Sequence, residues 1–326
     1  MKKFLIIIIF FLILTNTGAI FYAIEQVRCG QTSQFNNAYK WLNPQLRFTE
    51  EPVVSKTSYE IFRNDLIKIL EQLEKEGRIS EVAVFFRDLN NGPTFGINTN
   101  DKFIPASLLK VPLMLTYFRL AEENPALLNQ ELSDYKFPSD LTQGVAPSET
   151  LEEGKPYKVE DLLYRLIVYS DNRALQILSD YLSQISPDKS LYAETFNELG
   201  IIDAWSKDIE KETISVKSYA AIFWMLYNAS YLSKEFSNKA LDYLLKSEFN
   251  DGLRKGVPDA VPIAHKFGER FMEGNRQLHD CGIVYYPLNP YLLCVMTRGS
   301  DLNALSEAIG IVSKAVYEEF DSRRLK

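Results

Sequence analysis

The chain has 326 residues, of which 46% are hydrophobic and 13% aromatic, and its formal net charge is −7. This length and composition suit one large packed domain and exclude a disordered chain. The charged residues are dispersed rather than gathered in basic blocks, so we expect no nucleic-acid partner. Two histidines and three scattered cysteines give no metal-ligand cluster, and we therefore expect no metal and no cofactor.

The N-terminus has the pattern of an export signal. Lys2 and Lys3 precede an apolar run over residues 4–14, which continues with weak interruption to residue 23. About 20 apolar residues are also enough to span a bilayer as an uncleaved anchor. We therefore predict an exported protein, either secreted or periplasmic, or tethered to the membrane through residues 4–23. Residues 24–54 are polar with poor periodicity and predict a linker or a loosely packed arm.

The first regular elements follow this arm. Apolar residues recur at helical spacing over residues 58–75 and predict a helix. The apolar run at 82–86 predicts a strand, the Asn-Asn-Gly-Pro sequence at 90–93 predicts a turn, and residues 94–97 complete a hairpin.

The middle of the chain is predicted to be helical and its C-terminal part to return to strands. The clearest helical patterns cover residues 107–122, 159–168, 172–182 and 216–228. Strand patterns follow at 263–267, 281–286 and 291–297, and a final helix is expected over 302–320. Strands at both chain ends around a helical insert predict an α+β fold. We expect one antiparallel sheet formed from both ends, flanked by helices, with an all-helical subdomain and a cleft between the two.

The three cysteines give no clear disulfide framework. Cys29 lies too far beyond the apolar run, and lacks the small-residue context, to be interpreted as a lipid-attachment site. Cys281 and Cys294 fall in adjacent predicted strands, and we expect them to be buried apolar side chains rather than a bridge.

The first candidate catalytic motif is Ser-x-x-Lys, formed by Ser107 and Lys110. A serine hydroxyl becomes a good nucleophile only when a base removes its proton. Residues three apart share one face of a helix, so we expect Ser107 to begin its helix and Lys110 to reach the Ser107 hydroxyl. The same spacing recurs at 133–136 and 186–189, where a surface coincidence is the ordinary explanation. The apolar run at 111–115 predicts that the first pair is buried, which would lower the pKa of the lysine and suit it to act as a base.

Ser170, Asp171 and Asn172 form a second motif between two predicted helices. All three residue types are favoured at helix N-termini, so capping alone explains them adequately. Lys266 and Gly268 end a predicted strand, and an ordinary strand end is enough to explain them when they are taken alone. In a site, Lys266 would offer a cation to a carboxylate and Gly268 would let the backbone approach a ligand closely.

Taken in order, Ser-x-x-Lys, Ser-Asp-Asn and Lys-x-Gly resemble the motifs of class A β-lactamases and related penicillin-binding proteins, over residues 58–320. The resemblance implies that Ser107 is acylated and that Lys110 accepts its proton. It implies that Ser170 relays a proton to the leaving nitrogen and that Asn172 holds the substrate amide.

The same resemblance assigns the rest of the site. It implies that Lys266 attracts the substrate carboxylate, with Gly268 beside the ligand. It also implies that the backbone N–H groups of Ser107 and Glu269 form the oxyanion hole.

Two features depart from this family pattern. Phe267 replaces the threonine or serine whose hydroxyl would meet the substrate carboxylate, although strand alternation can turn the ring away from the cleft. The loop at 200–213 is short and lacks the Glu-x-x-Leu-Asn sequence that supplies the base for deacylation. Of its carboxylates, Glu210 is the better candidate base and Glu212 fits a structural salt bridge.

The leading functional prediction is a serine hydrolase of the class A β-lactamase type that opens β-lactam rings through an acyl-serine, with a catalytic domain over 55–326. One alternative is a D-alanyl-D-alanine peptidase or esterase with slow deacylation. Another is a catalytically idle, membrane-tethered binding module on the same fold. The expected partner is a small molecule, either a β-lactam or a peptidoglycan-like peptide, and we expect a monomer.

Overall fold

The computed structural model describes residues 39–47, 59–90, 92–133, 135–137, 145–187, 191–201, 212–272 and 274–324. The predicted export segment at 4–23 and Cys29 lie outside these residues, so export stays a prediction. Over the residues described, no helix has both the length and the apolar character needed to cross a bilayer.

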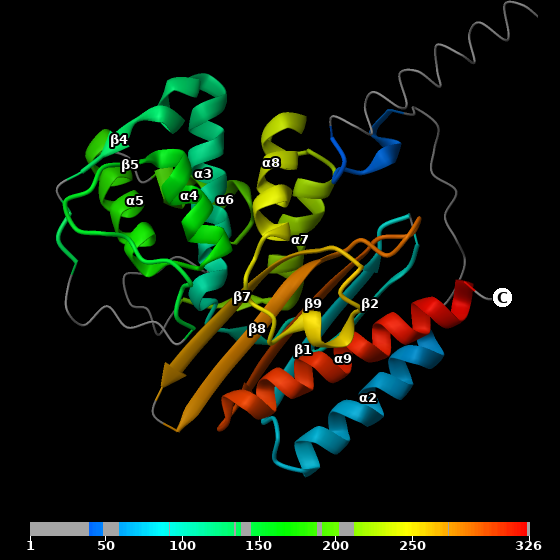
Figure 1. Cartoon of the computed structure of the whole chain (residues 1–326). Helices are drawn as coiled ribbons and strands as arrows, with labels where there is room; N and C mark the ends of the chain where they lie inside the picture. Colours follow the sequence, from blue (N-terminus) through cyan, green and yellow to red (C-terminus); the bar gives the residue numbers. More distant parts are fainter. Residues whose placement is uncertain are drawn as a thin grey trace, which may run out of the picture.

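The centre of the fold is a five-stranded sheet in the order β2-β1-β9-β8-β7, in which every neighbouring pair is antiparallel. Two strands come from the N-terminal part of the chain and three from its C-terminal part (Figure 1): β1 (Glu81–Asp88), β2 (Thr94–Ile97), β7 (Ile263–Met272), β8 (Asn275–Val284) and β9 (Tyr291–Gly299). The predicted α+β class and the sheet built from both chain ends are therefore confirmed.

Each face of the sheet is covered by its own set of helices. Along β1, Val82, Val84 and Phe86 pack toward α2 (Glu60–Lys75) and α9 (Leu302–Arg324), which lie together on one face (Figure 1). Ala83 belongs to the second core, on the opposite face. This period of two is what a strand buried on both faces requires.

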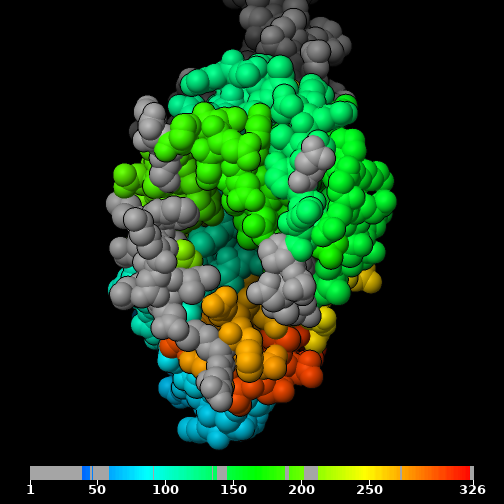
Figure 2. Space-filling model, turned by 90° about the vertical axis from the view of Figure 1, so that its left-hand side faces the viewer, coloured from blue at the N-terminus to red at the C-terminus, as the bar shows by residue number. Residues whose placement is uncertain are grey.

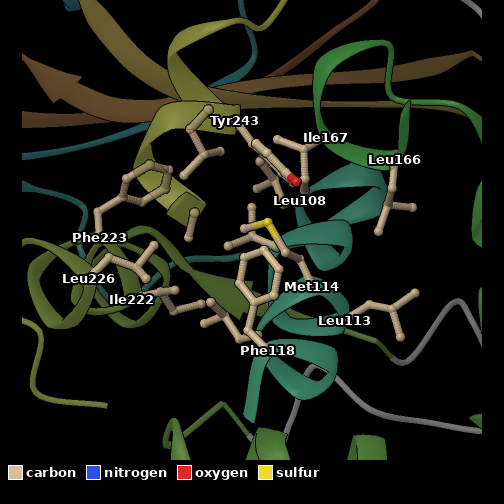
Figure 3. Packing of buried hydrophobic residues seen from close by; sticks show 14 of the residues in the cluster. Leu108, Leu113, Met114, Phe118, Leu166, Ile167, Ile222, Phe223, Leu226 and Tyr243 are labelled. Carbon is tan, nitrogen blue, oxygen red and sulfur yellow. The ribbon is translucent and has the colours of Figure 1, made fainter. Parts of the chain in front are cut away.

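The second core is formed by the helical part of the chain. Its helices are α3 (Lys110–Glu123), α4 (Val159–Val168), α5 (Asn172–Ile185), α6 (Leu191–Glu198), α7 (Val216–Tyr227) and α8 (Lys234–Leu245). Figure 3 shows Met114 and Phe118 of α3 surrounded by Ile167 of α4, Phe223 of α7 and Tyr243 of α8. Full burial of side chains of this size contributes about 1.5–3 kcal/mol each, so α3 is held as a rigid element.

Short elements complete the fold. The described residues also form two two-stranded pairs, β3 (Lys102–Phe103) with β6 (Ile214–Ser215) and β4 (Glu131–Leu132) with β5 (Tyr157–Lys158). The 3-10 turns are η1 (Pro44–Arg47), η2 (Ala106–Leu109), η3 (Pro125–Asn129) and η5 (Leu253–Gly256).

The helix predicted over 107–122 starts three residues later, because η2 precedes α3. Proline has no N–H and fits only the first turn of a helix without loss of a hydrogen bond. With α3 beginning at Lys110, Pro112 lies in that first turn; with a start at Ser107 it would interrupt the helix. Ser107 therefore lies in a tight turn ahead of the helix, and the expectation that it begins the helix is wrong.

Residues 39–47 are packed on the domain rather than loose. Leu42 is only 3% exposed, and the Asn43 N–H donates to the carbonyl of Tyr227 at 2.8 Å. The hydroxyl of Tyr285 donates to the carbonyl of Trp41 at 2.9 Å. The prediction of a linker or loosely packed arm fails for this part, because an aromatic and a leucine in a polar segment give no periodic signal but still fill a hydrophobic site.

Cys281 and Cys294 form a disulfide between β8 and β9. The two residues are directly opposite each other in the antiparallel register and both are fully buried. The expectation that they would be unbonded apolar side chains is therefore wrong, although their burial is as expected. Their pairing depends on the register of the hairpin, which the residue types alone do not fix.

Candidate active site

A cavity of about 880 Å³ opens where the free edge of β7 meets the helical part. Figure 2 shows the hollow between the green helical region and the orange strands of the sheet. Five of the predicted site residues line this cavity: Ser107, Lys110, Ser170, Asn172 and Glu269. They come from η2, α3, the α4–α5 connection, α5 and β7, so the three sequence motifs converge on one site.

The hydroxyl of Ser170 lies between two lysines. Lys110 Nζ donates to Ser170 Oγ at 3.1 Å, and Lys266 Nζ donates to the same oxygen at 2.8 Å. Lys110 Nζ also donates to the backbone carbonyl of Ser170 and to Asn172 Oδ1, the latter at 2.7 Å. Since Ser170 Oγ accepts from both lysines, its own O–H is directed away from them.

Burial shifts the protonation of both lysines. Desolvation lowers the pKa of Lys110 to about 7, against a smaller opposing effect of the nearby Asp171 carboxylate. Lys266 is fully buried, and its pKa lies well below the ordinary lysine value because of desolvation and the positive charge of Lys110. A lysine whose pKa is close to neutrality can accept a proton under physiological conditions.

The turn that carries Ser107 is fixed by hydrogen bonds from two tyrosines. Tyr219 Oη donates to the carbonyl of Leu108 at 2.9 Å, and Tyr192 Oη donates to that of Leu109 at 2.8 Å. Ala106, just before Ser107, has a φ of 49°, a left-handed value that costs an alanine free energy. The surrounding bonds hold this strained turn and thereby set the position of Ser107.

The predicted contact between Lys110 and the Ser107 hydroxyl is replaced by other bonds. Among the residues described, Ser107 Oγ has no hydrogen bond, and the Lys110 amine is used by Ser170 and Asn172. The cause is the η2 turn: in a 3-10 segment the side-chain directions differ from those of the regular helix that the spacing predicts.

The Ser-Asp-Asn motif combines capping with site formation. Asp171 caps α5, because its Oδ1 accepts from the N–H of Arg173 at 2.7 Å and, more weakly, from that of Ala174 at 3.4 Å. Ser170 has a φ of 52°, which turns its hydroxyl toward the lysines before the helix starts. The capping explanation is thus confirmed for Asp171, while its two neighbours face the cavity.

The phenylalanine of the third motif contacts both the core and Lys266, whose Nζ lies 4.2 Å from the centroid of the Phe267 ring. Phe267 is buried and stacks on Phe249, with ring centroids 4.0 Å apart. Phe267 belongs to the core cluster that includes residues of α9, and it also lines the cavity beside Lys266, which donates to Ser170. Strand alternation therefore does not separate the ring from Lys266: stacking on Phe249 and the contact with the Lys266 amine hold the ring where the family pattern has a hydroxyl.

Gly268 permits the close approach of β7 to η2. A Cβ at this position would lie 2.6 Å from the carbonyl oxygen of Pro105 and 2.9 Å from Cγ of Leu108. The structure thus gives the glycine a packing reason, and a direct contact with a ligand stays a prediction.

We expect Gly268→Ala to lower the rate of serine acylation by about tenfold or more, because the new methyl group displaces the turn that carries Ser107. The rate is measured by mass spectrometry with an acylating β-lactam. Gly154→Ala is the control: its Cβ meets no atom within 4 Å, and only the positive φ of 74° is strained. An equal loss of acylation in both variants would contradict this explanation.

Comparison with known proteins agrees with this fold. A model of the β-lactamase enzyme family matches residues 65–320, which is most of the chain. The chain belongs to the β-lactamase enzyme family. No curated protein sequence matches it.

Solved structures of this family share the fold at low sequence identity. A point mutant of PBP-A, solved as an acyl-enzyme complex with penicillin G, is 21% identical with a TM-score of 0.66, covering 80% of this chain and 97% of that one. A β-lactamase from Chitinophaga pinensis is 20% identical with a TM-score of 0.67, covering 79% and 100%. A β-lactamase from Sphaerobacter thermophilus is 23% identical with a TM-score of 0.66, covering 78% and 95%.

Of the carboxylates considered as the base for deacylation in this β-lactamase family member, the structure describes only Glu212. Glu210 and Asp208 lie outside the described residues, so the role of Glu210 stays a prediction. Glu212 is described and lines the cavity. Its negative charge contributes to the raised pKa of Tyr192, which is chiefly due to burial.

Several cavity residues were not predicted from the sequence, namely Tyr192, Arg270, Phe271 and Arg276. Arg270 carried a usable signal, because it follows Gly268 by two positions and strand alternation puts both on one face. Tyr192 had no such signal in the sequence, since its place in the site depends on the packing of α6 against α3. Within the described ranges, no group of three His, Cys, Asp or Glu could hold a metal ion.

Both histidines have structural roles. Thr297 N–H donates to Nδ1 of His279, and Nε2 of that ring lies 3.0 Å from the carbonyl of Ile104, which defines a neutral ring. Burial lowers the pKa of His279 to about 4. His265 Nδ1 lies 2.9 Å from Oδ1 of the buried Asp280, under the sheet and away from the cavity.

Proposed function

We propose that the protein is a serine hydrolase that opens β-lactam rings through an acyl-enzyme on Ser107. The observation that carries this proposal is the Ser170 hydroxyl, which accepts hydrogen bonds from Lys110 and Lys266 beside the cavity that contains Ser107. A nucleophile, a base of lowered pKa and a proton relay within one cavity are the components that acyl transfer to serine needs.

The acylation step follows from these groups. Neutral Lys110 accepts the Ser107 proton while the serine oxygen attacks the ring carbonyl, and the oxyanion meets the backbone N–H groups of Ser107 and Glu269. Collapse of the tetrahedral intermediate breaks the carbon–nitrogen bond of the ring. Ser170 donates its proton to the leaving nitrogen, and Lys110 supplies a proton back to Ser170.

Release of the acyl group needs a water molecule and a base. Glu210 remains our proposed base, and Glu212 is an alternative because it lines the cavity. The absence of the Glu-x-x-Leu-Asn sequence from residues 200–213 favours a second candidate function, a D-alanyl-D-alanine peptidase or esterase with slow deacylation. The acyl-enzyme of PBP-A with penicillin G is solved on the same fold and supports this candidate.

A time course of intact protein mass in benzylpenicillin tests these functions. We expect wild type to gain the mass of one penicillin and Ser107→Ala to gain none. An adduct that forms and then disappears supports the β-lactamase, and an adduct that persists supports the peptidase. If wild type forms no adduct and also does not hydrolyse the benzylpenicillin, the site does not acylate and the idle binding module is the remaining function.

A further inference from the structure

Arg270 lies on the cleft face of β7. Lys266, Gly268 and Arg270 alternate with Phe267 along the strand and therefore share one face. The other two residues of this row identify that face, since Lys266 bonds to Ser170 and the missing Cβ of Gly268 points at Pro105. Arg270 lines the cavity together with Ser107 and Asn172.

The guanidinium of Arg270 has no partner within the described part of the chain. It forms no ion pair there, and its Nε is buried without a hydrogen bond. Asp180 and Glu212 also line the cavity, but neither bonds to it. A buried Nε–H without an acceptor costs free energy, and a ligand anion that accepts from it would remove that cost.

Arg276, the other cavity arginine of the β7–β8 hairpin, interacts with protein groups. Arg276 lies 4.8 Å from the ring centroid of Phe271, its cross-strand neighbour. Its charge also acts on Glu269, where it opposes the rise in pKa that desolvation causes. Arg276 therefore interacts with protein groups. Arg270, in contrast, has no ion pair or side-chain hydrogen bond with a described residue and is the cation of the β7–β8 hairpin that can bind a ligand.

The position of Arg270 along β7 indicates which part of a substrate it meets. Four residues of strand separate it from Lys266 by about 13 Å. Glu269, whose N–H is assigned to the oxyanion hole, lies between them. Lys266 is beside the Ser170 relay and hence on the leaving-group side, so Arg270 lies beyond the reacting carbonyl, on the acyl side.

We infer that Arg270 selects substrates that carry a carboxylate on the acyl portion, close to the bond that is cleaved. This inference rests on the proposed acylation of Ser107. A planar guanidinium binds a carboxylate through two parallel hydrogen bonds, which gives orientation as well as attraction. Arg270 is a specificity residue and is not required for the bond-breaking step.

Carbenicillin and benzylpenicillin provide a matched test, because they differ only by a carboxylate on the acyl side chain. Acylation rate constants for both are measured by intact mass in wild type, Arg270→Gln and Arg119→Gln. Arg119 is an exposed cation on α3 that pairs with Glu122, and it serves as the control. We expect Arg270→Gln to lower the carbenicillin-to-benzylpenicillin rate ratio by about tenfold, and Arg119→Gln to leave it unchanged.

Added salt should reduce the same ratio in wild type and not in Arg270→Gln. If both penicillins acylate wild type and Arg270→Gln with the same ratio, the inference is overturned while the proposed function stands. If neither penicillin acylates wild type, the proposed function fails and the inference fails with it. Because the Arg270 side chain has no hydrogen bond or ion pair with a described residue, its replacement by glutamine breaks no such bond in the described part of the chain.

Discussion

Lys110→Met is expected to slow acylation of Ser107 by about 10³- to 10⁴-fold, because it removes the general base while keeping a side chain of similar length. Lys110→Arg should be as slow, since a guanidinium does not lose its proton at any accessible pH. The rate is measured by intact mass with benzylpenicillin. Lys217→Ala, which removes an exposed lysine of α7, is the control and should acylate at the wild-type rate.

The pH dependence of acylation gives an independent check of the same group. Lys110 must be neutral to accept a proton, and its pKa is lowered to about 7 by burial. The acylation rate of wild type should therefore rise with pH through about 7 and reach a plateau about one unit above it. A rate that does not change between about pH 5.5 and 8.5 would show that another group takes the proton.

Ser170→Ala is the second large effect that we expect, a loss of about 10²- to 10³-fold in acylation. The substitution removes the hydroxyl that both Lys110 and Lys266 bind, so the leaving nitrogen loses its proton donor. Ser183→Ala, an exposed hydroxyl on α5 that bonds only to the carbonyl of Ser179, is the matched control.

The leaving group distinguishes a relay from a structural role. With a β-lactam or ester whose leaving group needs no proton, Ser170→Ala should recover most of the lost rate. An equal loss for all leaving groups would mean that the serine only positions Lys110 and Lys266.

Elements with a clear periodic pattern could be predicted from the sequence. The helix expected over 159–168 has the bounds of α4, and the strands expected at 94–97 and 291–297 correspond to β2 and β9. The strand expected at 263–267 continues to Met272 as β7, because the β7–β8 hairpin provides cross-strand partners as far as Asn275. Pairing of this kind extends strands through polar residues, which a search for apolar runs misses.

The residue types at the site could be predicted, but their contacts only in part. Order and composition of the motifs identified Ser107, Lys110, Ser170 and Asn172 as residues of one cavity. The bonds of Lys110 depend on the η2 turn and on the left-handed backbone of Ser170, and neither has a signature in the residue types. The disulfide of Cys281 was missed for a similar reason, since it depends on which residue faces which across two strands.

The place of β1 in the sheet bears on how the chain folds. β1 pairs along its whole length with β9, so that Glu81 is opposite Arg298 and Asp88 is opposite Tyr291. The sheet therefore cannot form completely until β9, near the end of the chain, has been synthesised. Before that, β1 and β2 are a lone hairpin of marginal stability. Contacts between such distant segments slow folding, because the entropy of closing a long loop is lost before the contacts form. The sheet that carries Lys266 is thus complete only when β1 has paired with β9, and a chain that lacks β9 cannot complete the proposed site.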